Sequence, residues 1–218
     1  YKGNKSYAAL YADIVIHSYH AVKNITTGEG GAVLSNNKDI YNKIKILRSH
    51  GVVKNKTSSK PWNYEMRFLG YNYRISDIQC SLGISQLKKL NKFVKKRNSI
   101  AKIYKEVFSG EKLFKIQEIR KDDYNGYHLF PLLVDFQKSG KKKLDFFKYL
   151  RKKKVQLQVH YTPIHLQPFY MKKFGYKKGD FPIAENFFKN EISLPIYYNL
   201  ELSKVKKIAS MIKNYILK

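Results

Sequence analysis

The sequence predicts an α/β fold, because strand-like and helix-like segments alternate along the chain and one long amphipathic helix separates two regions of different pattern. The region before this helix is typical of the end of an α/β domain, and the region after it has enough elements for a small α+β domain. A chain of 218 residues is long enough to bury a sizeable core. We therefore expect part of a large domain at 1–75, a connecting helix at 76–109 and a small C-terminal domain at 110–218.

The first region contains two short apolar runs followed by a helix. Residues 13–18 and 32–34 are rich in isoleucine, valine and leucine, so both are expected to be buried strands. Apolar side chains recur at helical spacing over 37–48, with Asn37 as a suitable N-cap. Residues 52–73 are polar and lack periodicity, which predicts an irregular connector. Two strands and one helix cannot cover both faces of a sheet, so the rest of this domain is expected to be absent.

The long helix is predicted from about residue 76 to Phe108, with an apolar stripe on one face and lysine and arginine on the other. The elements expected after it are a strand at 127–135, a basic helix at 141–153, a strand at 155–161, a short helix at 169–174, an apolar segment at 192–197 and an amphipathic helix at 202–217. These elements could form a small α+β domain by themselves.

The charge is strongly positive, since 43 basic and 16 acidic residues give a net charge of +27. Such an excess suggests a protein that binds nucleic acid or an anionic surface, and this alternative stays open. Only six of the basic residues are arginine, the side chain that forks onto phosphate and guanine. The lysine runs are dispersed and no known nucleic-acid-binding motif accompanies them. The pattern therefore favours a solvated lysine-rich surface and no specific nucleic acid.

No apolar stretch approaches the roughly 20 residues that a membrane helix needs, so no membrane partner is expected. The single cysteine excludes an intrachain disulfide framework and favours a reducing cytoplasm. Two histidine pairs, His17 with His20 and His160 with His165, lack carboxylates at ligand spacing. We therefore expect no metal site.

One segment has the composition of a reactive site: residues 18–31 read Ser-Tyr-His-Ala-Val-Lys-Asn-Ile-Thr-Thr-Gly-Glu-Gly-Gly. It places Lys23 after an apolar strand, among hydroxyl groups and before a glycine-rich turn. A partly desolvated lysine can be neutral, which is the state that forms a Schiff base. The hydroxyls of Ser18, Thr26 and Thr27 could contact a phosphate. On the residues alone, however, a solvated loop lysine beside a hairpin is favoured.

This segment resembles the lysine segment of the DegT/DnrJ/EryC1/StrS family of pyridoxal-phosphate-dependent nucleotide-sugar aminotransferases, which are fold-type-I enzymes. Further matches follow in the family's order: Arg-Ser-His-Gly at 48–51, Leu-Gly-Tyr-Asn-Tyr-Arg-Ile-Ser-Asp-Ile-Gln at 69–79, Val-His-Tyr-x-Pro at 159–163 and Ser-Leu-Pro at 193–195. The resemblance covers essentially the whole chain. It implies the C-terminal part of a fold-type-I aminotransferase, which comprises the end of the large α/β domain plus the small α+β C-terminal domain.

The resemblance also implies roles for three residues. Lys23 would be the catalytic residue that carries pyridoxal 5'-phosphate (PLP) covalently and later moves a proton. Ser18 would contact the cofactor phosphate or the substrate. Asn72 would reach the cofactor and substrate from the neighbouring subunit, which implies a homodimer with shared active sites. Alternatively, Ser18 only ends a strand and Asn72 only holds a turn.

Within the family, the closest likeness is to enzymes that transfer an amino group, with L-glutamate as the expected donor, to C4 of a UDP-4-keto-6-deoxy-N-acetylhexosamine in pseudaminic acid biosynthesis. The likeness is carried by residues 20–23, 85–89, 158–161 and 191–195. It implies that the UDP-sugar substrate contacts Gln158, Val159, His160 and Tyr161. An amide, an imidazole and a phenol suit sugar hydroxyls and a pyrophosphate, although they could equally be the outward residues of a strand edge.

The family's aspartate that keeps the pyridine nitrogen protonated would lie upstream of Tyr1–Lys5, as would the aromatic residue that stacks on the ring and the turn that cradles the phosphate. We therefore expect the chain to be part of a longer enzyme. Alone, it should have little transaminase activity and should fold poorly over its first 75 residues. A degenerate family member that serves only as a dimer partner is a further alternative.

Overall fold

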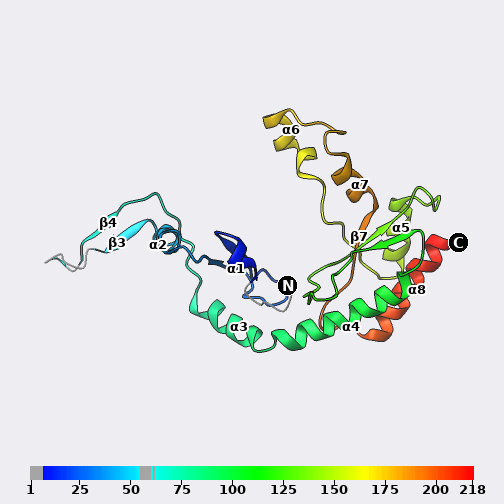
Figure 1. The fold of residues 1–218 in the computed structure, drawn as a ribbon, viewed down its shortest axis with the longest axis horizontal. Helices are drawn as coiled ribbons and strands as arrows, with labels where there is room; N and C mark the ends of the chain where they lie inside the picture. Colours follow the sequence, from blue (N-terminus) through cyan, green and yellow to red (C-terminus); the bar gives the residue numbers. More distant parts are fainter. Residues whose placement is uncertain (1–6, 55–59, 61) are drawn as a thin grey trace. The chain divides into compact units, whose positions relative to one another are not determined.

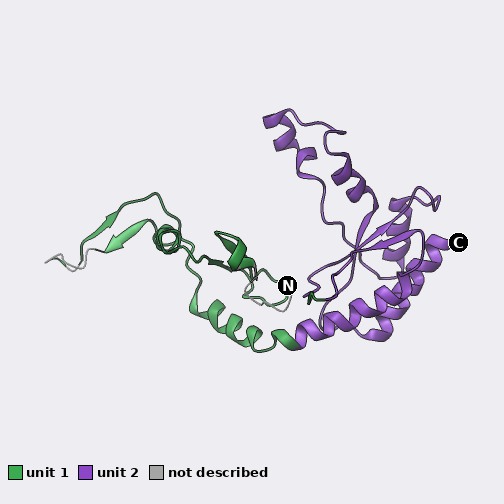
Figure 2. Cartoon of the chain, viewed as in Figure 1, with its two compact units in different colours: residues 1–91, 122–124 green, residues 92–121, 125–218 purple. Residues whose placement is uncertain are grey.

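The computed structural model describes residues 7–54, 60 and 62–218, and the chain divides into two compact units (Figure 2). Unit 1 comprises residues 1–91 with 122–124, and unit 2 comprises residues 92–121 with 125–218. The main boundary falls near the start of a long helix. The division that the sequence predicts, with limits at 75 and 109, stays a prediction.

Unit 1 is built from short elements (Figure 1). In chain order they are α1 (Tyr7–Tyr11), β1 (Val15–Ser18), β2 (Gly31–Leu34), α2 (Lys38–Leu47), β3 (Val52–Lys54), β4 (Tyr64–Met66) and α3 (Asp77–Leu87). Strands β1 and β2 pair antiparallel, from Val15 opposite Leu34 to Ser18 opposite Gly31. Strands β3 and β4 form a second antiparallel pair. The two strands predicted at 13–18 and 32–34 are therefore confirmed, but the prediction that they are buried is wrong, because most residues of both strands are exposed. The predicted irregular connector at 52–73 contains the antiparallel strands β3 and β4.

Two helix starts in unit 1 follow from local side-chain chemistry. The Asn37 carboxamide accepts hydrogen bonds from the main-chain N–H groups of Asp39 and Ile40, at 2.9 and 3.1 Å, and so caps α2. At the start of α3, Ser76 and Gln79 form a reciprocal capping box. These caps satisfy donors that would otherwise lack partners.

The prediction of a single long helix from about 76 to Phe108 is wrong in one respect. The segment forms two helices, α3 and α4 (Leu90–Phe108). Between them the main-chain N–H of Lys89 donates to the carbonyl of Gln86, three residues back, at 2.9 Å. This tight turn interrupts the α-helical hydrogen-bond pattern. Neither glycine nor proline marks the position, so the apolar spacing continues across it without a signal.

Unit 1 has no apolar core of its own among the residues that the structure describes. Among all the described residues of the chain, every buried hydrophobic side chain belongs to unit 2. Large side chains of unit 1 stay accessible, for example Ile16 (76%), Leu69 (86%) and Ile78 (85%). Apolar burial is the main term that offsets the conformational entropy lost on folding, and the described residues of unit 1 supply little of it. This finding gives the expected poor folding of the first 75 residues a physical basis.

Unit 2 is a three-stranded antiparallel sheet covered by helices (Figure 1). After α4 its elements are β5 (Phe114–Ile116), β6 (Phe130–Val134), α5 (Lys143–Lys152), the 3₁₀ helix η1 (Ile164–Leu166), α6 (Pro168–Phe174), α7 (Pro182–Asn190), β7 (Glu191–Leu194) and α8 (Leu202–Leu217). The strand order is β5-β6-β7. Helices α5, α6 and α8 confirm the helices predicted there, while β5 and α7 have no counterpart among the predicted elements.

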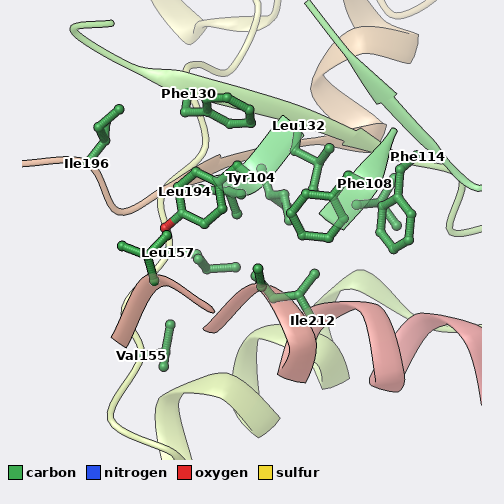
Figure 3. Close-up of a cluster of buried hydrophobic side chains, with 14 of the residues drawn as sticks. Tyr104, Phe108, Phe114, Phe130, Leu132, Val155, Leu157, Leu194, Ile196 and Ile212 are labelled. Atoms are coloured by element: carbon green, nitrogen blue, oxygen red, sulfur yellow. The ribbon is translucent and has the colours of Figure 1, made fainter. Parts of the chain in front are cut away.

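The core of unit 2 lies between one face of the sheet and the helices α4, α5 and α8 (Figure 3). Phe130 pairs with Leu194 and Leu132 pairs with Ile192, so these four side chains project from the same face of the sheet. Tyr104, which is fully buried, lies against them, with its ring centroid 5.0 Å from that of Phe130. Alternation then places the other residues of β6 and β7 on the opposite face.

The side chain of a buried arginine donates hydrogen bonds to main-chain carbonyls that would bond to a neighbouring strand if β6 were longer. One terminal nitrogen of Arg97 donates to the carbonyls of Tyr127, His128 and Ile196, at 2.9, 3.1 and 3.0 Å. Arg97 is 6% exposed, and burial lowers its pKa from the ordinary value. The strand predicted at 127–135 therefore shortens to β6, because its first carbonyls bond to a side chain.

The strand predicted at 155–161 is wrong. Only Gln158 forms a bridge, with Ser193 of β7, in which the main-chain N–H of each residue donates to the other's carbonyl. Two residues further on, the N–H of His160 donates to the carboxylate of Glu191 instead of a strand carbonyl. The ladder ends there, because a side chain has replaced the main-chain acceptor.

A histidine–carboxylate pair joins η1 to α7. His165 is 7% exposed, and its Nε2 lies 2.9 Å from Oε1 of Glu185. The same oxygen accepts from the main-chain N–H of Gly179 at 2.7 Å. The hydrogen bond with His165 is the first cause that lowers the pKa of Glu185, and the Gly179 bond is the second. The pair therefore holds the loop before α7.

Replacing Glu185 with glutamine is expected to lower the thermal stability of unit 2 most near neutral pH. A carboxyl whose folded pKa is lowered contributes stability above its unfolded pKa of about 4.3, and loses that contribution as the pH falls through the folded value. Thermal unfolding of wild type and variant, followed by circular dichroism from neutral pH into acid, should show two melting temperatures that converge. A difference that widens in acid would contradict the assignment.

In the part of the chain that the structure describes, no helix combines the length and the apolar character needed to cross a membrane.

Candidate functional site

Lys23 lies in the connection between β1 and β2 of unit 1. Two main-chain hydrogen bonds close this loop: Tyr19 N–H donates to the carbonyl of Gly30 at 2.9 Å, and Thr27 N–H donates to that of Tyr19 at 3.0 Å. Inside the loop, Lys23 N–H donates to the carbonyl of His20 at 3.0 Å. The Lys23 side chain is partly buried. The chain therefore presents this amine from a turn whose main chain is fixed at both ends.

The two threonines of the loop brace it. The Thr26 hydroxyl donates to the carbonyl of Tyr19 at 2.9 Å and accepts from Gly28 N–H at 2.8 Å. The Thr27 hydroxyl donates to the carbonyl of Glu29 at 2.7 Å, and Thr27 is 5% exposed. Both hydroxyl protons are therefore engaged within the loop. The sequence suggested these residues as phosphate contacts, and the structure gives them a part in holding the loop.

The glycine-rich end of the loop packs against the start of α3. A Cβ atom on Gly30 would lie 2.3 Å from the hydroxyl oxygen of Thr27, so a larger residue does not fit there. The Gln79 carboxamide donates to the carbonyl of Glu29 at 2.9 Å while also completing the α3 capping box with Ser76. Sequence reasoning missed this role, although the Ser-x-x-Gln pattern of a capping box was available as a signal.

Ser18 ends β1 with an exposed side chain. Its hydroxyl accepts a long hydrogen bond of 3.4 Å from the main-chain N–H of His20. The ring of His20 lies 3.6 Å from the carboxylate of Glu29, and these side chains are 47% and 77% exposed. Such an exposed pair contributes little to stability. The hydroxyl of Ser18 is thus sterically accessible on the same loop as Lys23.

Asn72 lies on a different segment of unit 1, where it forms an isolated bridge with Ser49. This contact depends on a close approach of two chain segments. A Cβ atom on Gly51 would lie 1.8 Å from the carbonyl oxygen of Phe68, and one on Gly70 would lie 2.1 Å from the nitrogen of Gly51. The two glycines therefore allow the segments to meet. The Asn72 side chain is exposed.

A hollow of about 810 Å³ lies beside the glycine-rich end of the β1–β2 loop, between β2, α2 and the segment around Tyr71 and Tyr73. Tyr71 and Tyr73 stack with their ring centroids 4.8 Å apart. The described residues that line the hollow include neither Lys23 nor Asn72. It is therefore part of the accessible apolar surface of unit 1 and does not itself contain the predicted reactive amine.

The remaining predicted residues, Gln158 to Tyr161, belong to unit 2. Val159 and His160 are partly buried, whereas Gln158 is exposed and Tyr161 is 73% exposed. The rings of His160 and Tyr161 meet edge to face, with centroids 4.5 Å apart. The segment lies beside β7 through the bridge to Ser193. The structure thus places Ser18 and Lys23 on one loop, Asn72 on a second segment of unit 1, and these four residues in unit 2.

The groups on this loop fit PLP, which offers an aldehyde and a phosphate. A primary amine is the group that condenses with the aldehyde, and Lys23 supplies one from a braced turn. The hydroxyl of Ser18 can donate to a phosphate oxygen. Because Thr26 and Thr27 are occupied within the loop, Ser18 and Lys23 are the side chains of this loop best suited to hold the cofactor.

Known aminotransferases are similar to this chain in sequence and in structure. One relative, the UDP-4-amino-4,6-dideoxy-N-acetyl-beta-L-altrosamine transaminase of Campylobacter jejuni subsp. jejuni serotype O:23/36 (strain 81-176), is 41% identical over 206 residues, which are 94% of this chain and 52% of the relative. The structure of Helicobacter pylori PseC, an aminotransferase involved in the biosynthesis of pseudoaminic acid, matches with a TM-score of 0.85 and 35% identity, over 94% of this chain and 54% of that one.

A putative sugar aminotransferase from Streptococcus pneumoniae, Spr1654, matches in its PMP form with a TM-score of 0.87 and 28% identity, over 99% of this chain and 55% of that one, and it has also been solved in a PLP form. The chain thus spans about half the length of the relatives it matches. The family profile described as DegT/DnrJ/EryC1/StrS aminotransferase matches residues 1–213. With a lysine loop that fits PLP and a match over nearly its whole length, this chain belongs to the DegT/DnrJ/EryC1/StrS family of PLP-dependent aminotransferases.

Proposed function

We propose that this chain supplies the catalytic lysine and part of the nucleotide-sugar site of an aminotransferase. The enzyme would transfer an amino group from L-glutamate to C4 of a UDP-4-keto-6-deoxy-N-acetylhexosamine, in pseudaminic acid biosynthesis. The observation that carries the proposal is the position of Lys23, a partly buried lysine on a loop braced by its own threonines. The named transaminase and PseC relatives support the choice of substrate class.

PLP, when bound, withdraws electrons from the amino-bearing carbon and so makes its proton removable. Lys23 would hold the cofactor through its amine and, once released, would accept a proton from that carbon and return it elsewhere as a general base. Ser18 would donate its hydroxyl to the cofactor phosphate or to the substrate. The braced loop keeps the amine at one position through both tasks, which is the entropic advantage of a preorganised site.

The assembly is also part of the proposal. We place Asn72 at the cofactor and substrate of a neighbouring subunit in a homodimer, and Gln158, Val159, His160 and Tyr161 at the UDP-sugar. The exposed side chains of Asn72 and Tyr161 are compatible with contacts to groups outside the chain. The accessible apolar surface of unit 1 supports a need for further polypeptide. The cytoplasm is the proposed compartment.

The test uses an assembled enzyme, defined as this chain co-expressed with the half of the Campylobacter jejuni relative that it does not match. Borohydride reduction after addition of PLP should fix the cofactor on Lys23, identified by peptide mass spectrometry. Amino transfer from glutamate to the UDP-4-keto sugar should accompany it. The chain alone should show little of the Lys23 adduct and little amino transfer. An adduct absent from Lys23 in the assembled, folded enzyme would refute the proposal.

A further inference from the structure

A buried carboxylate stands beside the segment proposed to contact the UDP-sugar. Glu191 is the first residue of β7, and none of its surface is accessible (0%). Its Oε2 accepts a hydrogen bond from the main-chain N–H of His160 at 2.9 Å, and its Oε1 accepts from the hydroxyl of Ser193 at 2.5 Å. A carboxylate is costly to bury unless it is bonded in this way. Both of its oxygens are therefore committed to the surroundings of His160.

The strand register explains why these groups meet. Gln158 lies opposite Ser193 in an antiparallel bridge, so the same register places His160 opposite Glu191. Glu191 and Ser193 are two residues apart on β7 and project from one face of the strand, while Ile192 between them projects into the core. His160 is thus held over the face of β7 that carries the carboxylate and the hydroxyl.

The hydrogen bonds fix where the imidazole proton lies. Ser193 has one hydroxyl proton, and it donates that proton to Glu191. The Ser193 oxygen, 2.6 Å from Nδ1 of His160, must then accept a proton from that nitrogen. A neutral His160 therefore carries its proton on Nδ1 and keeps a lone pair on Nε2.

The ammonium of Lys143 lies against the main chain at Glu191. The ammonium of Lys143 donates to the main-chain carbonyls of Glu191 and Phe188, at 2.7 and 2.8 Å. Burial lowers the pKa of Lys143, and the negative charge of Glu191 opposes that lowering. The Glu191 carboxylate itself accepts both of its hydrogen bonds, from His160 N–H and from the Ser193 hydroxyl.

We infer that Glu191 is a positioning residue that acts through Ser193 to fix the His160 proton on Nδ1, so that Nε2 is presented as a hydrogen-bond acceptor for a hydroxyl of the nucleotide-sugar. The identity of that ligand rests on the proposed function. The Glu191–Ser193–His160 relay, defined by these three side chains, is measurable without cofactor, substrate or turnover.

The relay is tested on the full chain labelled with ¹⁵N-imidazole histidine. Long-range ¹H–¹⁵N correlation spectra at a pH above the ordinary histidine titration range distinguish the two neutral tautomers. His160 is assigned by the loss of its signals in the variant His160→Gln. Wild type should show His160 protonated on Nδ1. A wild-type His160 protonated on Nε2 would overturn the inference, whatever the outcome for transamination.

The variant Glu191→Gln should reverse the relay. The Gln carbonyl must still accept from His160 N–H, so its amide group faces Ser193 and donates to the hydroxyl oxygen. Ser193 then gives its proton to Nδ1, and the His160 proton should move fully to Nε2. If the variant retains wild-type backbone spectra and the Nδ1 tautomer, the inference is wrong.

Ser193→Ala provides a second test if Glu191→Gln does not fold, because it removes the middle of the relay and should release His160 from a single tautomer. Glu185→Gln is the matched control, since it alters the other histidine–carboxylate pair of unit 2 and should leave His160 unchanged. In the assembled enzyme, Glu191→Gln should raise KM for the UDP-sugar about tenfold with little change in kcat. An unchanged KM with a switched tautomer would overturn the positioning role.

Discussion

Replacement of Lys23 by alanine is expected to abolish the reducible PLP adduct and to slow amino transfer by the assembled enzyme by at least about 10²–10⁴-fold. This range corresponds to the loss of a positioned proton-transfer group alone, and the loss of the covalent anchor adds to it. The loop that carries Lys23 is closed by main-chain bonds and by Thr26 and Thr27. Truncating the amine should therefore leave the loop in place. Borohydride trapping and initial rates measure the two effects.

Two further variants separate chemistry from charge. Lys23→Arg keeps a positive charge but cannot condense with an aldehyde, so it should be as inactive as Lys23→Ala. Lys54→Ala removes a lysine from an exposed position of β3 in the same unit and should leave rate and adduct unchanged. Wild-type activity in Lys23→Arg would show that Lys23 acts as a charge, and the proposed role would then fail.

Replacing Arg97 with methionine is expected to lower the free energy of unfolding of unit 2 by about 3–5 kcal/mol. The guanidinium is the donor for three main-chain carbonyls, in two buried hydrogen bonds and one partly buried one, and each buried acceptor left without a partner costs about 1–3 kcal/mol, not fully additively. The carbonyls belong to the entry of β6 and to the segment after β7. Urea unfolding of the full chain, followed by far-ultraviolet circular dichroism, measures the loss.

Lys95→Met is the matched control for Arg97→Met, because Lys95 is an exposed basic residue of the same helix. Its effect should stay within about 0.5 kcal/mol. Arg97→Lys should fall between the two, since the shorter lysine side chain keeps a charged donor but cannot place it where the terminal nitrogen of Arg97 lies. Equal unfolding midpoints for Arg97→Met and Lys95→Met would contradict the structural role of Arg97.

The helices of this fold are readable from the sequence because their signals are local. Apolar spacing and an asparagine N-cap predict α2, and α8 begins and ends at the predicted residues, Leu202 and Leu217. Three-residue strands such as β5 are too short to show a period. The predicted strand at 155–161 fails for a different reason, since a buried glutamate 31 residues away takes the His160 N–H.

For the candidate site too, the sequence predicts what depends on neighbouring residues and not what depends on contacts distant in sequence. The lysine, the threonines and the glycines of the loop stand next to one another in the sequence, so the resemblance could assign Lys23 a role. Glu191 borders an apolar segment, and only strand register brings it to His160. Ser193 was visible as part of a Ser-Leu-Pro motif, but its function as the link between a carboxylate and an imidazole depends on contacts distant in sequence.

Because the described part of unit 1 lacks an apolar core, the fraction of chains with a folded active-site loop should depend on the concentration of a binding partner. Lys23 belongs to this unit, so under the proposed function the stability of its loop rises with the logarithm of the concentration of the polypeptide that covers it. Unit 2 carries its own core and has no such dependence. When the covering polypeptide is scarce, unit 2 should stay folded while the loop that carries Lys23 is no longer held in place. Under the proposed function, the number of chains with a folded Lys23 loop then depends on the abundance of the covering polypeptide.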